Sequence, residues 1–249
     1  MKRIRIIPAL LLMDEGFYKT VKFKNPKYVG DPINTVKIFN EKGADEIVIL
    51  DITATKDNKP INYKKISEIA GEAFMPMAYG GGIKTFDDAK RVFDAGYEKV
   101  ILNASAFETP GLIGEIANVY GSQSAVVSID AMPNLFGKYR VYIYNGSKNT
   151  GKTPSEYAAE LEKQGAGEII INAIDKDGTW GGYDITLTKM VSEVVSIPVI
   201  ACGGAASMDD FKRAVIEGGA SAVAAGSMFV YQKKGMGVLI NFPAQALKI

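Results

Sequence analysis

Eight short apolar runs recur along the chain, and segments with helical spacing of their apolar residues separate them. The runs are too short for core helices and rich in Val and Ile, which indicates buried strands. They cover residues 5–12, 46–52, 76–81, 99–103, 125–130, 168–174, 198–204 and 222–227. Strands that alternate with helices predict a parallel sheet, and eight such units in a chain of this length predict a closed (β/α)8 barrel, the TIM barrel.

Residues 31–43 and 153–165 show the helical pattern most clearly. Thr85 stands directly before another helical segment and is expected to cap its N-terminus. Glycines follow several of these segments, and a glycine after the last helical residue is a common stop signal. We expect Gly43 and Gly165 to end helices in this way.

One stretch of the chain repeats itself 122 residues later. Residues 75–107 return as 197–229, with matching glycine pairs and matching Asp-Asp pairs, and residues 43–50 return as 165–172 at the same shift. Repetition of a strand, glycine turn and helix unit predicts a barrel built from two duplicated half-barrels. We therefore expect a single barrel domain over residues 1–249.

The composition excludes several classes of function. The chain has 249 residues, 47% of them hydrophobic, and a net charge of +1, so nothing indicates a nucleic-acid or membrane partner. The apolar N-terminal stretch contains Pro8, ends at Asp14 and lacks a small-residue cleavage site, which argues against a signal peptide. With one cysteine and no bilayer-length apolar run, a cytoplasmic protein is expected.

The chain contains no histidine. Histidine-ligated zinc, a Ser-His-Asp triad and a histidine general base are therefore excluded, and proton transfer falls to Asp, Glu, Lys, Tyr, Cys202 or a bound ligand. We expect no metal and no cofactor.

Two glycine groups, in residues 80–82 and 203–204, follow equivalent strands of the two halves. Glycine lets a phosphate approach the backbone closely, although it can also simply close a tight turn. The strands that come next end in small residues, which leave room for the same phosphate. We therefore predict two phosphate-binding sites, here called grips, for a substrate with two anionic ends. One consists of Gly81, Gly82, Asn103 and Ala104, and the other of Gly203, Gly204, Gly226 and Ser227.

Carboxylates between these two ends are candidates for catalysis. Asp51 and Asp130 close apolar strand runs, where a side chain can point into the mouth of the barrel. Asn172, Asp177 and Gly178 come at or just after the sixth run and are candidates for substrate contact. The alternative for each carboxylate is a structural role in capping a loop.

Two connections are longer than a usual βα turn, and both follow strands at the end where barrel enzymes build their sites. Residues 13–31 carry four lysines, among them Lys19, a candidate substrate contact; residues 131–151 have the pattern of a hairpin. We expect lid or substrate-contact roles, with a solvated basic loop as the alternative.

Four charged residues directly precede apolar runs and so belong to the opposite end of the barrel. If Arg5, Glu46, Lys99 and Glu168 point inward, they form a ring of two positive and two negative charges. Charges at that end of a barrel are usually structural, but a mutually paired ring can also gate a small polar solute.

Nearly the whole chain resembles HisF, the cyclase subunit of imidazole glycerol phosphate synthase. The resemblance is carried by LDITA (50–54), GGGI (80–83), NTG (149–151), DKDGTWGGYD (175–184) and CGGA (202–205). It implies phosphate grips at both glycine pairs and a HisH-like glutaminase docked at the end where the charged ring lies. It also implies that ammonia passes that ring, because the family's gate residues match Arg5, Glu46, Lys99 and Glu168.

The chain departs from the family at one catalytic position. The family pairs two aspartates, at the ends of the first and fifth strands; Asp130 matches the second, but Leu11 occupies the first. A leucine cannot transfer a proton. Asn172 and Asn145 also stand where the family usually has threonine and serine. Asp14, three residues beyond Leu11, is not assumed to replace the missing aspartate.

Residues 19–23, 27–42 and 75–85 resemble a second HisF-type branch, found with bacterial surface-polysaccharide systems. That resemblance implies acetamidino modification of a sugar, together with a HisH-like glutaminase and a separate sugar amidotransferase. Two alternatives remain: a histidine-pathway cyclase with an altered proton relay, and a non-catalytic ammonia conduit. A sugar isomerase of the related HisA type is disfavoured, since its chemistry also requires the first-strand aspartate.

Overall fold

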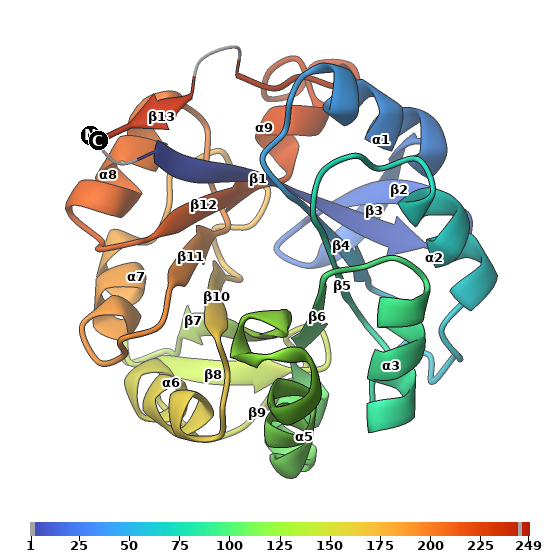
Figure 1. Ribbon diagram of the computed structural model, residues 1–249. Coiled ribbons are helices and arrows are strands. Elements are labelled where there is room, and N and C mark those ends of the chain that lie inside the picture. Colours follow the sequence, from blue (N-terminus) through green and yellow to red (C-terminus); the bar gives the residue numbers. More distant parts are fainter. Residues whose placement is uncertain (1–2, 244–245) are drawn as a thin grey trace.

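The computed structural model describes residues 3–243 and 246–249. Within them, eight parallel strands form a closed barrel, because β12 pairs with β1 and β10 pairs with β7. Figure 1 looks along the barrel, with the helices arranged around the strands. The barrel strands are β1 (Arg3–Met13), β4 (Ile47–Asp51), β5 (Met77–Gly80), β6 (Lys99–Leu102), β7 (Ala125–Pro133), β10 (Glu168–Ala173), β11 (Val199–Cys202) and β12 (Ala222–Ala225). The predicted TIM barrel is confirmed.

The outer layer consists of helices that follow the strands. Its longer helices are α1 (Pro32–Glu41), α2 (Tyr63–Ala70), α3 (Phe86–Asp94), α5 (Gly111–Tyr120), α6 (Pro154–Lys163), α7 (Ile185–Ser192) and α8 (Met208–Ile216). Short helices α4 (Ala104–Glu108) and α9 (Ser227–Val230) occupy equivalent places in the two halves, and a 3-10 turn, η1, spans Ser122–Ser124. After α9, an irregular segment completes the layer where Phe242 packs on Phe39 and Phe229.

Strand alternation divides the apolar side chains into two groups. The larger group lies between the strands and the helices. A smaller one, which includes Ile7, Val48, Ile101 and Ile170, fills the middle of the barrel. In the part of the chain described here, no helix combines the length and the apolar character needed to cross a membrane.

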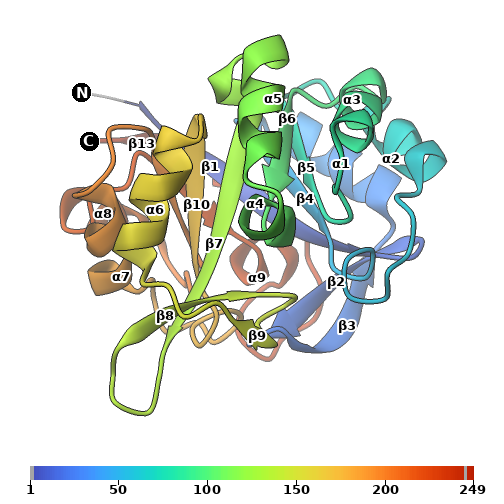
Figure 2. The same cartoon turned by 90° about the horizontal axis from the view of Figure 1, so that it is seen from below.

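Two hairpins project from the carboxyl ends of the barrel strands, as Figure 2 shows. The first consists of β2 (Gly16–Val21) and β3 (Lys24–Gly30), and β2 pairs with β1. The second extends β7 into β8 (Tyr139–Ile143) and β9 (Lys148–Asn149), which confirms the hairpin expected in residues 131–151. At the opposite end, β13 (Leu247–Lys248) pairs with the start of β1.

Helices α3 and α8, at equivalent places in the two halves, begin with the same capping motif. Thr85 accepts a hydrogen bond from the backbone of Asp88, whose carboxylate accepts one in return from the Thr85 backbone, at 3.1 and 2.9 Å. Ser207 and Asp210 repeat this capping box at α8. The predicted cap at Thr85 is therefore present. Gly43 and Gly165 follow α1 and α6 with φ of 70° and 105°, left-handed conformations that glycine adopts without strain.

These caps yield a stability prediction. Thr85→Ala and Ser207→Ala should each lower the free energy of unfolding by about 1 kcal/mol, since each leaves a helix N–H without its acceptor. Ser67→Ala, at an exposed position inside α2, is the control and should change it by less than about 0.5 kcal/mol. Urea unfolding measures all three. Equal losses in the control and the cap variants would contradict the prediction.

Candidate functional site

A cavity of about 550 Å³ opens at the carboxyl ends of the barrel strands. Every barrel strand contributes to its wall, so the cavity lies on the barrel axis. Its lining includes Ala9, Leu11, Leu50, Gly80, Ile101, Ser128, Asp130, Asn172, Cys202 and Ala225. The hairpins contribute Lys19, Thr20 and Phe23 from the first, and Tyr144 and Asn145 from the second.

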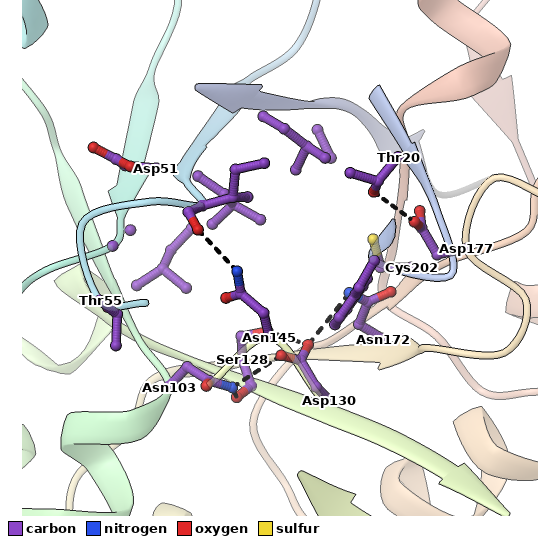
Figure 3. A pocket seen from close by; sticks show the side chains of 18 of the residues that line it. Thr20, Asp51, Thr55, Asn103, Ser128, Asp130, Asn145, Asn172, Asp177 and Cys202 are labelled. Atoms are coloured by element: carbon purple, nitrogen blue, oxygen red, sulfur yellow. Dashed lines mark hydrogen bonds between the residues drawn. The ribbon is translucent and has the colours of Figure 1, made fainter. Parts of the chain in front are cut away.

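Asp130 is the central polar group of this cavity. Its buried carboxylate accepts hydrogen bonds from Asn172 at 3.3 Å, Ser128 at 3.3 Å and Asn103 at 3.2 Å. Figure 3 shows these side chains converging from neighbouring strands. Burial raises the pKa of Asp130 to about 7. The three hydrogen bonds favour the charged form and act in the opposite direction, but their effect is smaller. Near neutral pH this carboxyl can therefore either donate or accept a proton.

Ser128 was not predicted from the sequence. It lies two residues before Asp130 on the same strand, so strand alternation directs both side chains inward. That alternation was the available signal, but serine is too common in strands for the pattern alone to identify it.

The wall across from Asp130 is apolar. Strand β1, which carries Leu11, lies on the far side of the barrel from β7. Leu11 is half-buried, and its neighbours in the wall are Ala9 and Leu50. Asp14 lies outside the cavity lining, at an exposed turn, where its carboxylate pairs with Lys59 at 3.0 Å. The part of the wall formed by Ala9, Leu11 and Leu50 is thus apolar, whereas the part around Asp130 is polar.

Asp51 borders the cavity but is directed away from the Asp130 cluster, as Figure 3 shows. One of its oxygens accepts hydrogen bonds from the backbone and hydroxyl of Thr53, both at 2.8 Å, and from the backbone of Ala54 at 2.9 Å. These contacts hold the turn after β4. They give Asp51 a structural role, and its catalytic role stays a prediction.

Lys19 and Asp177 were both predicted to contact an anionic substrate, and the structure pairs them with each other. The Lys19 ammonium donates to Asp177 at 2.7 Å, and the Thr20 hydroxyl donates to the other oxygen at 3.1 Å. The backbone N–H of Lys22 also donates to the Asp177 carbonyl at 2.9 Å. The first hairpin is therefore fastened to the loop after β10 and forms a wall of the cavity. Lys22, like Lys24 and Lys27, is exposed to solvent.

The glycine pairs lie at the cavity rim in both halves, but turn geometry already accounts for two of the glycines. A Cβ on Gly81 would lie 2.3 Å from the Asp51 carbonyl, and one on Gly204 would lie 2.3 Å from the Gly182 carbonyl. Gly178 is similarly confined by the Thr20 carbonyl at 2.4 Å. The rim residues that complete the two grips also line the cavity; they are Gly82, Asn103, Ala104, Gly203, Gly226 and Ser227. Phosphate binding there stays a prediction.

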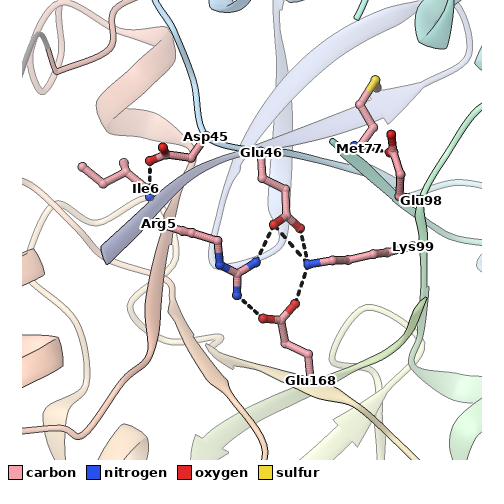
Figure 4. A network of polar contacts seen from close by, with 8 residues as sticks. All are labelled: Arg5, Ile6, Asp45, Glu46, Met77, Glu98, Lys99 and Glu168. Carbon is pink, nitrogen blue, oxygen red and sulfur yellow. Dashed lines mark hydrogen bonds and ion pairs between the residues drawn. The ribbon is translucent and has the colours of Figure 1, made fainter. Parts of the chain in front are cut away.

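At the opposite end of the barrel, the four predicted charges form a closed ring, shown in Figure 4. Arg5 donates to both Glu46 and Glu168, and Lys99 donates to the same two carboxylates at 2.9 Å each. Both glutamates are buried. Burial opposes the charge on Arg5, but the carboxylates of Glu168 and Glu46 raise its pKa above the ordinary value. Each buried charge is thus compensated by two of opposite sign.

Residues 3–243 and 246–249 contain no cluster of three or more acidic or cysteine side chains placed to hold a metal ion. Cys202, half-buried in the cavity wall, is a free thiol, and burial raises its pKa to about 12. It is therefore protonated at neutral pH.

Comparison with known proteins places these features in a family. The family described as "Histidine biosynthesis protein" matches residues 5–235. A protein of Pseudomonas aeruginosa named "Putative imidazole glycerol phosphate synthase subunit hisF2" is 49% identical, over 98% of this chain and 97% of its own length. A Leptospira borgpetersenii protein named "Putative imidazole glycerol phosphate synthase subunit HisF" is 47% identical, over 98% and 96%.

A further relative, "Imidazole glycerol phosphate synthase subunit HisF" of Alkaliphilus metalliredigens, is 41% identical over 92% of this chain and 91% of its own length. The residues matched by the family, 5–235, include both half-barrels, the residues that line the cavity and the charged ring. The chain therefore belongs to the histidine biosynthesis protein family, as a member of its HisF group.

Proposed function

We propose that this chain is the barrel subunit of a glutamine-dependent amidotransferase system. In this proposal a HisH-like glutaminase binds at the charged ring and releases ammonia there, and the barrel conveys the ammonia to the cavity. The main observation in support of this proposal is the closed ring of charges on the barrel axis, at the end opposite the cavity. Its members are Arg5, Glu46, Lys99 and Glu168.

The barrel interior supports transport of a neutral molecule. Between the ring and the cavity lie apolar side chains, among them Ile7, Val48 and Ile170. An ammonium ion would lose its hydration there without gaining a partner, whereas neutral ammonia is small and carries no charge to desolvate. Passage requires the ring to open, and Lys99 and Arg5 are its more exposed members, with side chains 17% and 34% exposed.

The cavity supports a reaction in which ammonia adds to an electrophilic carbon. Such an addition leaves a proton to be removed, and Asp130 has a pKa suited to accept it. The glycine-lined rims in both halves are proposed to hold a phosphate-bearing substrate across the opening, with Asn103 and Asn172 fixing the orientation of Asp130.

Leu11 supports the surface-polysaccharide branch over histidine synthesis. Ring closure in the histidine pathway is expected to need a carboxylate opposite Asp130, and the structure has an apolar wall there. We propose that the chain conveys or uses this ammonia in acetamidino modification of a surface-polysaccharide sugar, together with a separate sugar amidotransferase. If that enzyme performs all of the chemistry, this chain is a conduit, and Asp130→Asn should leave the overall flux intact.

The second candidate function is imidazole glycerol phosphate synthesis. It is favoured by the 41% identical relative that carries this name. Under this alternative the two rims would bind the two phosphates of one substrate, and ammonia would complete the imidazole ring.

The two candidates differ in a growth test. This chain should not rescue a histidine auxotroph that lacks its cyclase subunit, because general acid–base catalysis by the missing carboxylate is worth roughly 10²–10⁴-fold. Leu11→Asp is the matched variant, and it should turn over the bis-phosphate precursor faster than the unaltered chain. Growth of the strain, and loss of precursor absorbance with ammonium salt at alkaline pH, measure these effects. Vigorous growth with the unaltered chain would refute the sugar assignment.

A second prediction separates ammonia transport from chemistry. Lys99→Met removes one of the two cations that pair with both Glu46 and Glu168. The other cation, Arg5, remains. Glutamine-driven transfer by the complete complex should fall by roughly tenfold, while transfer driven by added ammonium salt should change little. Lys163→Met, at an exposed position on the same end of the barrel, serves as the control. An equal loss with both nitrogen sources would show that the ring only stabilises the fold.

The third prediction concerns pH. The ordinary pKa of Asp130 is 3.8 and its folded value is about 7, so the folded protein binds this proton more tightly than the unfolded chain does. The free energy of unfolding should therefore fall as pH rises between these values, by about 2 kcal/mol from pH 5 to 7 for this group alone. Asp130→Asn should remove this dependence. Urea unfolding at both pH values tests it, and parallel curves for the two proteins would contradict it.

A further inference from the structure

The side-chain amide of Asn172 is hydrogen-bonded on one side only. Its NH2 group donates to Asp130 Oδ1 at 3.3 Å. Its oxygen is buried and, within the residues that the structure describes, has no hydrogen-bond donor. The whole residue is only 9% exposed, so bulk water does not supply the missing donor. A buried acceptor without a donor lowers stability, and its presence beside the central carboxyl of the cavity calls for an explanation.

The unpaired oxygen is turned towards the turn that follows β11. A Cβ on Gly203 would lie 2.8 Å from Asn172 Oδ1 and also 2.8 Å from the Ala173 carbonyl oxygen. That carbonyl already accepts hydrogen bonds from the backbones of Lys176 and Asp177, at 3.1 and 3.0 Å. Two oxygens therefore lie near the same point beside Gly203. An NH2 group in the place of Asn172 Oδ1 would face an acceptor there.

The other amide that contacts Asp130 is fixed in its orientation. The NH2 group of Asn103 donates to the Ser128 carbonyl at 3.0 Å and to Asp130 Oδ2 at 3.2 Å. A half turn of this amide would place its oxygen against both of these acceptors. Asn172 has no such second tie in the described structure. It can therefore present either its NH2 group or its oxygen to Asp130 by a half turn about its last side-chain bond.

Asp130 needs different partners in its two protonation states. The carboxylate needs donors, and it receives them from Asn172, Ser128 and Asn103. The neutral carboxyl carries an O–H that needs an acceptor. Asn103 keeps its NH2 group on Oδ2, so the proton belongs on Oδ1, the oxygen that Asn172 faces. Burial raises the pKa of Asp130 to about 7, and both forms are therefore present near neutral pH.

We propose that Asn172 is the positioning residue for the proton of Asp130 and that its side-chain amide turns over when Oδ1 takes up that proton. With the carboxylate, Asn172 donates to Oδ1, as Figure 3 shows. With the neutral carboxyl, the Asn172 oxygen accepts the O–H, and the NH2 group moves to the side of Gly203. The amide thereby satisfies both forms of Asp130. The proposal deepens the proposed function and rests on it for the catalytic use of this proton.

Other titratable groups also lie around this pair. They are Cys202 on β11, Tyr142 on β8, Asp177 after β10 and Lys19 on β2. The pKa of the Cys202 thiol is raised by burial to about 12, so the thiol stays protonated below pH 9. Lys19 and Asp177 compensate each other at 2.7 Å. An Asp130→Asn variant separates the titration of Asp130 from that of these neighbours.

The first test is nuclear magnetic resonance of the full chain, labelled with heavy nitrogen in its asparagine side chains, at pH 5 and pH 8.5. The Asn172 amide is assigned through bonds from its own backbone. Its NH2 protons should show an Overhauser contact with the Hα protons of Gly203 at pH 5 and should lose that contact at pH 8.5. The contacts of the Asn103 amide should stay the same. In Asp130→Asn, the Asn172 contact should not depend on pH.

The second test compares matched variants of the two amides. Asn103→Leu removes a group that donates to the charged form only, so it should raise the proton affinity of Asp130 at least about tenfold. Asn172→Leu removes a partner of both forms and should change that affinity by less than about threefold. Titration of the Asp130 carboxyl carbon by nuclear magnetic resonance measures both effects.

Two results would overturn the proposal. One is an Asn172 contact with Gly203 that is the same at both pH values, which would leave the Ser128 hydroxyl as the acceptor of the proton. The other is a tenfold gain in proton affinity with Asn172→Leu, which would show that Asn172 acts as a donor only. Both measurements use this chain alone. Their failure would therefore leave the proposed ammonia route standing, because the growth and transfer experiments decide that route separately.

Discussion

Closure of the barrel by the pairing of β12 with β1 and of β10 with β7 imposes one constraint on all other parts of the protein. Once the sheet is closed, alternate side chains of every strand must point into a space that water cannot freely enter. Apolar side chains satisfy this in the middle of the barrel. Polar ones can be accommodated only where they find partners, which restricts them to its two ends.

The two ends meet that requirement in different ways. At the end where the strands begin, Arg5 and Lys99 each bridge Glu46 and Glu168, so the charges compensate one another. At the other end Asp130 receives neutral donors but no cation, and its carboxyl keeps a high pKa as a result. Ion pairing thus stabilises the charges at one end, and the lack of a paired cation at Asp130 leaves that carboxyl able to titrate near neutral pH.

The internal duplication explains why the second end has two similar rims. The capping boxes at α3 and α8 place equivalent glycine turns at the cavity, each confined by a neighbouring backbone carbonyl. The hairpins break this symmetry. The first fills one side of the mouth with the paired Lys19 and Asp177, while the second carries the exposed tip at Leu135 and Phe136. The two hairpins are therefore insertions that differ between the two halves of a repeated frame.

Local rules in the sequence were enough to predict the barrel, the helix cap at Thr85 and the placement of four charges at the starts of strands, because strand and helix periods and strand-end positions are local properties. That these four charges point inward and pair in a ring was decided by the tertiary structure. Only the tertiary structure decided that Lys19 is paired with Asp177 and that Asp51 holds a turn. It also placed Leu11 across from Asp130 and left Phe136 exposed. These outcomes depend on which residues distant in the chain become neighbours, and hence on burial and partner choice, which no local pattern records.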